Sequence, residues 1–179
     1  TRRIPSVVIP DDHDVYHGNL WGAGGRAAVA DPARGISAQD AGGYKYGPRF
    51  VNVVHATQTA HLPPPAISTT VDQGISVYTT QLDWGGVSFA VLADRQWKSS
   101  ATPLVPDGQV VNGWFQAPGF DPRDADVPGA QLLGEQQLDF LDRWADDWGG
   151  NTWMKVALSQ TPLANVASIP VESLGGGVL

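Results

Sequence analysis

The stretch from residue 75 to residue 92 constrains the fold most, because it has the pattern of a complete β-hairpin. Polar and apolar side chains alternate over 75–82, Asp-Trp-Gly-Gly follows at 83–86, and 87–92 is a largely apolar run. Alternation is typical of a strand with one buried face, and a Gly-Gly pair favours the tight turn between antiparallel strands. A continuous apolar strand is buried on both faces. We therefore predict that the second strand lies in the centre of a sheet.

A long helix and another strand are predicted further along the chain. The helix is predicted over 131–148, and Gly149-Gly150 supplies its stop. Residues 154–158 form an apolar strand. The 3–3–4 spacing predicts that the buried face of the helix consists of Leu138, Leu141, Trp144 and Trp148. These elements indicate an α/β fold in which a mixed sheet has flanking helices and long loops.

An acidic cluster lies near the start of the chain. Val7-Val8-Ile9 has the composition of a buried strand, and Pro10 ends it because proline has no N–H group to donate. Asp11-Asp12-His13-Asp14 follows, at the kind of strand end where ligand crevices form in open α/β sheets. Three carboxylates together need a cation or hydrogen-bond donors. They predict either a divalent metal site, with His13 free for acid–base work, or a solvated acidic turn.

Two further features have two interpretations each. Arg95 follows the predicted central strand, where a guanidinium group binds phosphoryl oxygens or pairs with a carboxylate such as Asp94 to fix the loop. The loop over 99–129 has no long periodic run and contains Trp114. That ring either stacks on a ligand or anchors the loop to the core.

Composition excludes several classes of protein. The 179 residues are enough for one domain core, and the whole chain is predicted to form one domain. The net charge of −7, with scattered basic residues, disfavours general binding of nucleic acid or anionic membranes. Cysteine is absent, and no apolar run is long enough to span a bilayer. Because Thr1 is not a methionine, we expect a segment of a longer chain.

Several motifs resemble one known family in order along the chain. The segments are DDHDVYHGNLWGAGG, FVNVVHATQTAHLPPP, VYTTQLDWGGVSFAVLADRQWKS, LLGEQQLDFLDRWADDW and WMKVALSQTPLANVA. Together they resemble the PhoD-like alkaline phosphatases, a branch of the calcineurin-like metallophosphoesterases. The resemblance implies metal-dependent hydrolysis of phosphate monoesters or diesters, on part of a metallophosphatase-type α/β sandwich. It also implies a secreted or periplasmic location.

The resemblance assigns roles to individual residues. Asp12, with Asp11 beside it, stands where the family binds metal, and a carboxylate there favours calcium or iron, with manganese or zinc as other candidates. His13 matches the catalytic histidine and Asp14 its acidic partner. Gln160 matches a glutamine of the family, and we assign it to substrate together with Arg95 and Asn19. The Asn19 amide either approaches a phosphate or metal or serves the turn beside Gly18. The family's other metal motifs lie before and after this stretch, so residues 1–179 would carry only part of a dinuclear site and are expected to be inactive alone.

A second hypothesis comes from another class of protein. The seven tryptophans would suit a non-catalytic binding module, for carbohydrate or with a structural calcium in the acidic turn. The helical spacing of Trp144 and Trp148 speaks against it, because a sugar-binding platform needs exposed rings.

Overall fold

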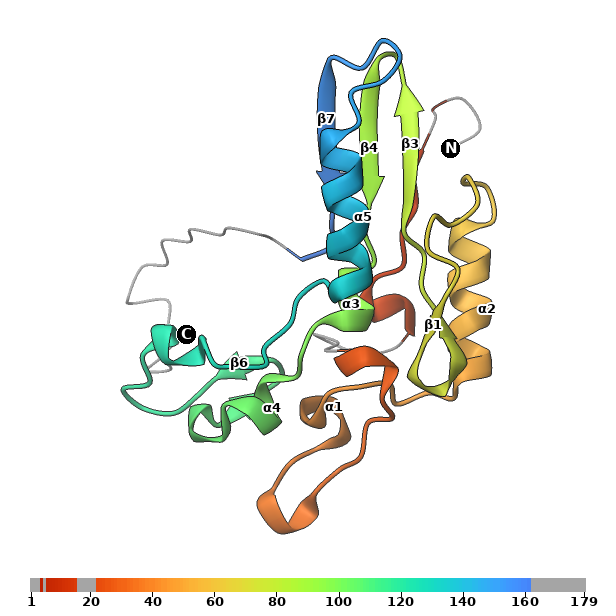
Figure 1. Ribbon diagram of the computed structural model, residues 1–179. Helices are drawn as coiled ribbons and strands as arrows, with labels where there is room; N and C mark the ends of the chain where they lie inside the picture. The colour runs from red at the N-terminus through yellow and green to blue at the C-terminus, as the bar shows by residue number, and fades with distance from the viewer. Residues whose placement is uncertain (1–3, 5, 16–21, 162–179) are drawn as a thin grey trace.

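The protein has a mixed α/β fold with small sheets and several helices (Figure 1). The structure, a computed structural model, describes residues 4, 6–15 and 22–161. Its largest sheet has the order β3-β4-β7, in which β3 is antiparallel and β7 parallel to β4. The bounds of these strands are Thr80–Trp84 for β3, Val87–Val91 for β4 and Met154–Leu158 for β7.

The predicted hairpin is confirmed, with β4 in the centre of the sheet. Its turn is the pair Gly85 and Gly86, with φ angles of 59° and 80°. Tight hairpin turns of this kind need positive φ at both positions, which glycine adopts without strain. The start of the predicted first strand differs, because β2 (Ile75–Ser76) pairs with β1 (Thr70–Val71) in a separate ladder.

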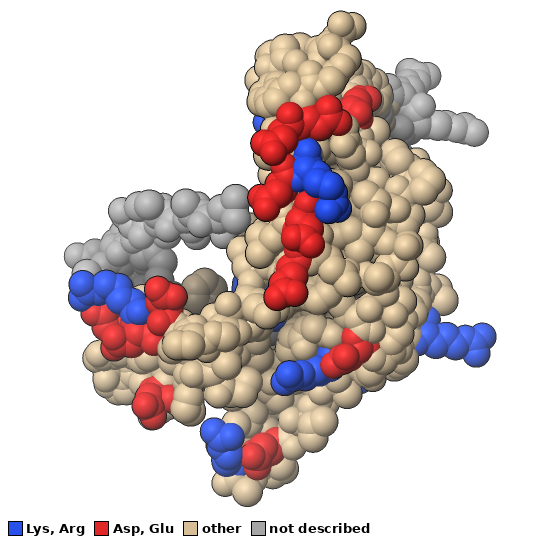
Figure 2. Space-filling view, viewed as in Figure 1, with Lys and Arg blue, Asp and Glu red and all other residues tan. Residues whose placement is uncertain are grey.

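Helix α5 (Glu135–Asp146) is the last element before β7 and covers one face of the sheet (Figure 1). Phe140 and Trp144 pack against Ala90 and Leu92, and the Trp144 indole N–H donates to Ser88 Oγ at 2.9 Å. The outward face of this helix carries a column of acidic side chains (Figure 2). The exposed acids of α5 are Glu135, Asp139, Asp142 and Asp146.

The predicted buried face of this helix is wrong at both ends. Leu138 is 50% exposed, and Trp148 lies beyond the last helical residue and is 55% exposed. The helix is rotated so that Gln137 faces the core instead, because its amide satisfies buried polar groups there. Trp148 packs against the Lys155 ammonium, 4.7 Å from the ring centroid. Apolar spacing alone does not reveal a buried glutamine.

The strand predicted over 7–9 is also wrong, because the structure assigns no strand to 6–10. Val7 and Val8 line a cavity with Leu82 and Phe89 of the sheet. They therefore lie over the face of the sheet. A β-branched run favours extended backbone, but a strand also needs a neighbouring edge to pair with.

The remaining elements lie mostly below the sheet in Figure 1, with α2 (Pro48–Thr59) at the lower right. Helix α2 packs beside β2 and is the longest of these. The short helices are α1 (Ala38–Ala41), α3 (Asp94–Trp97) and α4 (Ala101–Leu104), and a small ladder joins β5 (Val110–Val111) to β6 (Trp114–Phe115). Trp114 is 54% exposed, so of its two interpretations the one in which it anchors its loop to the core does not hold.

The core has two parts. One cluster lies between α5 and the sheet, and the other lies under α2, where Val51, Ile75 and Val77 meet Val15. Across the described part of the chain, no helix is long and apolar enough to cross a bilayer.

Substitution of Gln137 tests how α5 packs on the sheet. Its Oε1 accepts from the Ala93 N–H and the Thr79 hydroxyl, both at 2.8 Å, and its Nε2 donates to Leu133 O. Gln137→Leu leaves these buried groups without a partner and is expected to lower the free energy of unfolding by about 2–3 kcal/mol in urea titrations. Gln136→Leu, at the exposed neighbour, is the control and should change it by under about 0.5 kcal/mol. Equal effects of the two substitutions would contradict the assigned orientation of the helix.

Candidate functional site

The acidic cluster forms a single 3-10 turn, η1 (Asp12–Val15), closed by its own side chains. The Asp11 N–H donates to Asp14 Oδ2 at 2.9 Å, and the Asp12 N–H donates to Asp11 Oδ1 at 2.9 Å. The Asp14 N–H donates to Asp11 O at 3.2 Å. Carboxylates that bond to nearby backbone N–H groups stabilise such turns. These contacts explain the conformation of the backbone in the cluster. The negative charge of the buried Asp12 carboxylate still needs a positive charge near it.

Arg95 provides that charge. The Asp12 side chain is 5% exposed, and the Arg95 Nη2 atom lies 3.6 Å from its Oδ1. Arg95 Nε lies 3.1 Å from Asp11 Oδ1, and the arginine side chain is 15% exposed. The predicted pairing of Arg95 with carboxylates is thus present, although its partners are Asp11 and Asp12. Binding of phosphate by Arg95 stays a prediction.

Partial burial raises the pKa of the Asp11 carboxyl, and the Arg95 charge opposes that rise. Although Asp11 Oδ1 is at ion-pair distance, Arg95 Nε makes no hydrogen bond to any described residue. A buried N–H without an acceptor costs about 1–3 kcal/mol. An oxygen-rich anion beside Arg95 would remove that cost.

Asp94 and Gln160 join the end of β7 to the acidic turn. The Asp94 side chain is fully buried, and its carboxylate accepts from the N–H groups of Gln160 and Thr161, both at 3.1 Å. The Gln160 amide Nε2 donates to Pro10 O, immediately before the acidic cluster. Its Oε1 is buried without a hydrogen-bond partner among the described residues. Three segments distant in sequence therefore meet at the carboxyl ends of β4 and β7.

The structure places the other predicted residues as follows. His13 is exposed, with 83% of its side chain accessible, and its Nε2 lies 3.9 Å from Asp12 Oδ2. Asp14 accepts from the Asp11 N–H and, at 3.3 Å, from the Gln58 amide, so its role as the partner of His13 stays a prediction. Asn19 lies outside the described residues.

The donor set suits a hard cation only in part. Asp11 and Asp12 supply carboxylate oxygens, the ligands that calcium, magnesium and manganese prefer. Among residues 4, 6–15 and 22–161, however, no group of three or more His, Cys, Asp and Glu side chains converges as a metal site would require. The described residues thus provide part of a coordination shell.

Lys98, near this site, was missed by sequence reasoning. Lys98 lies one helical turn after Arg95, and burial lowers the pKa of its ammonium group, with the Arg95 charge adding to that effect. The charges of Asp94 and Asp12 oppose the shift. The spacing of three between Arg95 on α3 and Lys98, the residue that caps this helix, was the available signal. Gln58 of α2 lies in a motif that resembles the family, which indicates a substrate pocket, but its contact with Asp14 depends on the tertiary packing of α2 on η1.

His55 occupies a buried polar pocket beside the same turn. Its Nδ1 lies 2.9 Å from Ser76 O and its Nε2 lies 3.4 Å from the Gln96 amide nitrogen. An Nδ1–H that donates to Ser76 O leaves Nε2 as the acceptor for Gln96, which is the neutral form of the ring. Burial lowers the pKa of His55, and the contact with Ser76 and the Asp14 charge oppose that effect.

Comparison of the chain with models of protein families, with curated proteins and with solved structures found no match. The function must therefore be argued from the residues of the site and from the motifs in the sequence.

The lowered pKa of His55 predicts how the free energy of unfolding depends on pH. Because its pKa is lower in the folded protein than in the unfolded chain, the unfolded chain binds more protons below a pH of about 6.5. The free energy of unfolding should fall as the pH drops from 7.5 to 5.5. His55→Gln should flatten this dependence in urea titrations at each pH, whereas His61→Gln, at an exposed position, should not. An unchanged slope in His55→Gln would contradict a neutral buried ring.

Proposed function

We propose that this chain carries part of the active site of a metal-dependent phosphoesterase of the PhoD-like type, acting on phosphate monoesters or diesters. The finer fold assignment, part of a metallophosphatase-type α/β sandwich, belongs to the same proposal. It is supported by the mixed sheet β3-β4-β7, by α5 on one face and by the long loops after β4.

The observation that carries the proposal is the position of Arg95 between the acidic turn and the carboxyl end of β4. The guanidinium group lies within ion-pair distance of Asp11 and Asp12, yet its Nε–H has no hydrogen-bond acceptor among the described residues. Guanidinium groups bind phosphoryl oxygens in a fork of N–H donors. A site with both carboxylates and an available guanidinium N–H matches a phosphate held together with a cation.

Each residue has a distinct role in this proposal. Asp12 and Asp11 would hold a hard cation, which supplies Lewis acidity and an activated water for attack on phosphorus. Arg95 orients the phosphoryl group. His13, exposed beside Asp12, donates a proton to the leaving oxygen. Gln160, fixed through Pro10 O immediately before the acidic cluster, supplies a buried Oε1 without a hydrogen-bond partner among the described residues.

The second hypothesis, a tryptophan-rich binding module, keeps limited support. Trp114 is more than half exposed, as a sugar-stacking ring must be. Trp144, however, is buried against the sheet and bonded to Ser88, so it contributes only to the core. The buried Asp12–Arg95 pair is also more than a solvated calcium turn requires. We therefore place the phosphoesterase first.

The activity can be tested with 4-nitrophenyl phosphate and bis(4-nitrophenyl) phosphate, in calcium, iron or manganese. The chain should be assayed beside a longer polypeptide extended in both directions, because the resemblance places further metal motifs there. We expect turnover in the longer protein, and His13→Ala should lower kcat by about 10²- to 10⁴-fold by removing the general acid. Asp124→Ala, at an exposed carboxylate on the 3-10 turn η6 (Pro122–Ala125), is the control. An unchanged kcat in His13→Ala would remove that role, and metal-loaded, folded protein without turnover would contradict the proposed function.

A further inference from the structure

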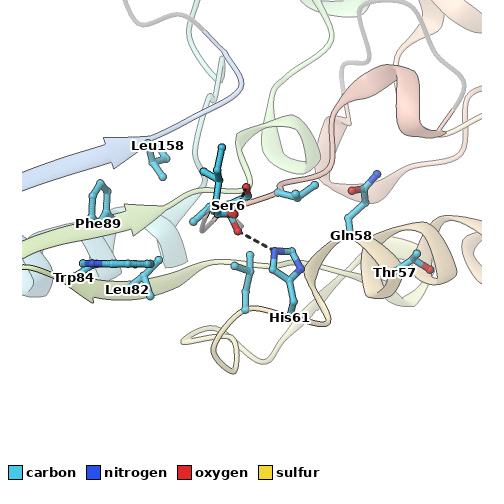
Figure 3. Close-up of a pocket in the computed structure, with 12 residues that line it drawn as sticks. Ser6, Thr57, Gln58, His61, Leu82, Trp84, Phe89 and Leu158 are labelled. Carbon is cyan, nitrogen blue, oxygen red and sulfur yellow. Dashed lines mark hydrogen bonds between the residues drawn. The ribbon is translucent and has the colours of Figure 1, made fainter. Parts of the chain in front are cut away.

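A cavity of about 910 Å³ lies beside the candidate site (Figure 3). Its walls come from Ile4 and residues 6–8, from the end of α2 with the residues after it, and from the three-stranded sheet. Successive side chains of a strand point to opposite faces. Because Ser88 and Ala90 face α5, Phe89 faces the cavity, and so does Leu82, its partner on β3. The cavity thus lies on the face of the sheet opposite α5.

The two ends of this cavity differ in polarity. Figure 3 shows Leu82, Trp84, Phe89 and Leu158 together at the sheet end and Thr57, Gln58 and His61 at the α2 end. His61 Nε2 lies 3.2 Å from Ser6 O, which ties the α2 end to the N-terminal segment. A cavity with an apolar body and a few polar groups at one end is typical of a site for a small organic molecule, and about 300–1,000 Å³ is the usual size of such sites.

The polar end adjoins the acidic turn. Gln58 lines the cavity, and its amide Nε2 donates to Asp14 Oδ1 at 3.3 Å. A single molecule could therefore place a charged group at the turn and an apolar group over the sheet. A sugar in the same place would bring hydroxyl groups onto Leu82 and Phe89, where they would lose their hydrogen bonds to water.

The geometry points to a phosphoester of an apolar alcohol, aryl or long-chain alkyl, as the substrate class. Its phosphoryl group lies at Asp11, Asp12 and Arg95, and its organic group fills the cavity against Trp84 and Phe89. This inference rests on the proposed function for the phosphoryl end. The assignment of the apolar organic group depends only on the cavity and its lining residues.

The test is calorimetric titration of the chain with 1-naphthol and 1-naphthyl phosphate, with and without manganese. Trp84→Ala removes an aromatic side chain that lines the cavity. Trp114→Ala is the matched control, because Trp84 and Trp114 are 57% and 54% exposed and Trp114 does not line the cavity. Arg95→Gln and Arg95→Lys test the phosphoryl end. Circular dichroism checks that each variant folds.

We expect both compounds to bind, and Trp84→Ala to weaken both by about five- to tenfold, the value of one aromatic contact. Trp114→Ala should change neither by more than about twofold. The ester should bind more tightly than the alcohol in manganese, and the Arg95 variants should remove only that difference.

Failure of the two parts of this account would look different. If 1-naphthol does not bind, or if Trp84→Ala and Trp114→Ala act equally, the cavity is no ligand site and the apolar face is covered by protein. If 1-naphthol binds through Trp84 but the phosphate group adds no affinity and the Arg95 variants change nothing, the proposed function and the assignment of an ester both fail.

Discussion

The ion pairs of Arg95 with Asp11 and Asp12 are the interaction on which the arrangement of the site depends. A carboxylate as buried as that of Asp12 costs several kcal/mol in a protein interior unless an opposite charge lies close to it. Arg95 supplies that charge and at the same time fixes the acidic turn against the end of β4. The carboxylates of Asp11, Asp12 and Asp14 outnumber the positive charges of Arg95 and the nearby Lys98, so the cluster retains negative charge that a bound cation would neutralise.

The fold brings the other site residues to this pair through buried polar contacts. Asp94, next to Arg95, accepts from two N–H groups at the end of β7, and Gln160 at that end donates to Pro10 O. Such contacts are costly to break when no water replaces them. The ends of two neighbouring strands and the acidic turn are therefore held in one place. An α/β sheet binds its ligands at this edge.

The sequence predicted the parts of the fold that local patterns determine. The Gly85-Gly86 turn, the central position of β4, the strand β7 and the existence of α5 followed from alternation, apolar runs and glycine stops. The rotation of α5 did not, because a buried glutamine replaces the leucine that apolar spacing favours. The run over 7–9 was misassigned because strand formation depends on a partner edge that lies elsewhere in the chain. In the site, Arg95 was predicted from the end of β4, whereas Asp11 and Asp12 were predicted after a strand that the structure does not contain, and the acidic cluster itself was the signal that held. Gln58 reached Asp14 only through the packing of α2.

Binding of manganese to the acidic turn tests the central claim most directly, namely that these carboxylates hold a cation beside Arg95. Manganese prefers the same oxygen ligands as calcium and is observed by electron paramagnetic resonance. The account predicts saturable binding that Asp12→Asn weakens at least about tenfold by removing the buried anionic ligand, while Asp124→Asn, at an exposed carboxylate of η6, leaves it unchanged. Equal affinity in the two variants would contradict the account and leave Asp12 as a structural partner of Arg95.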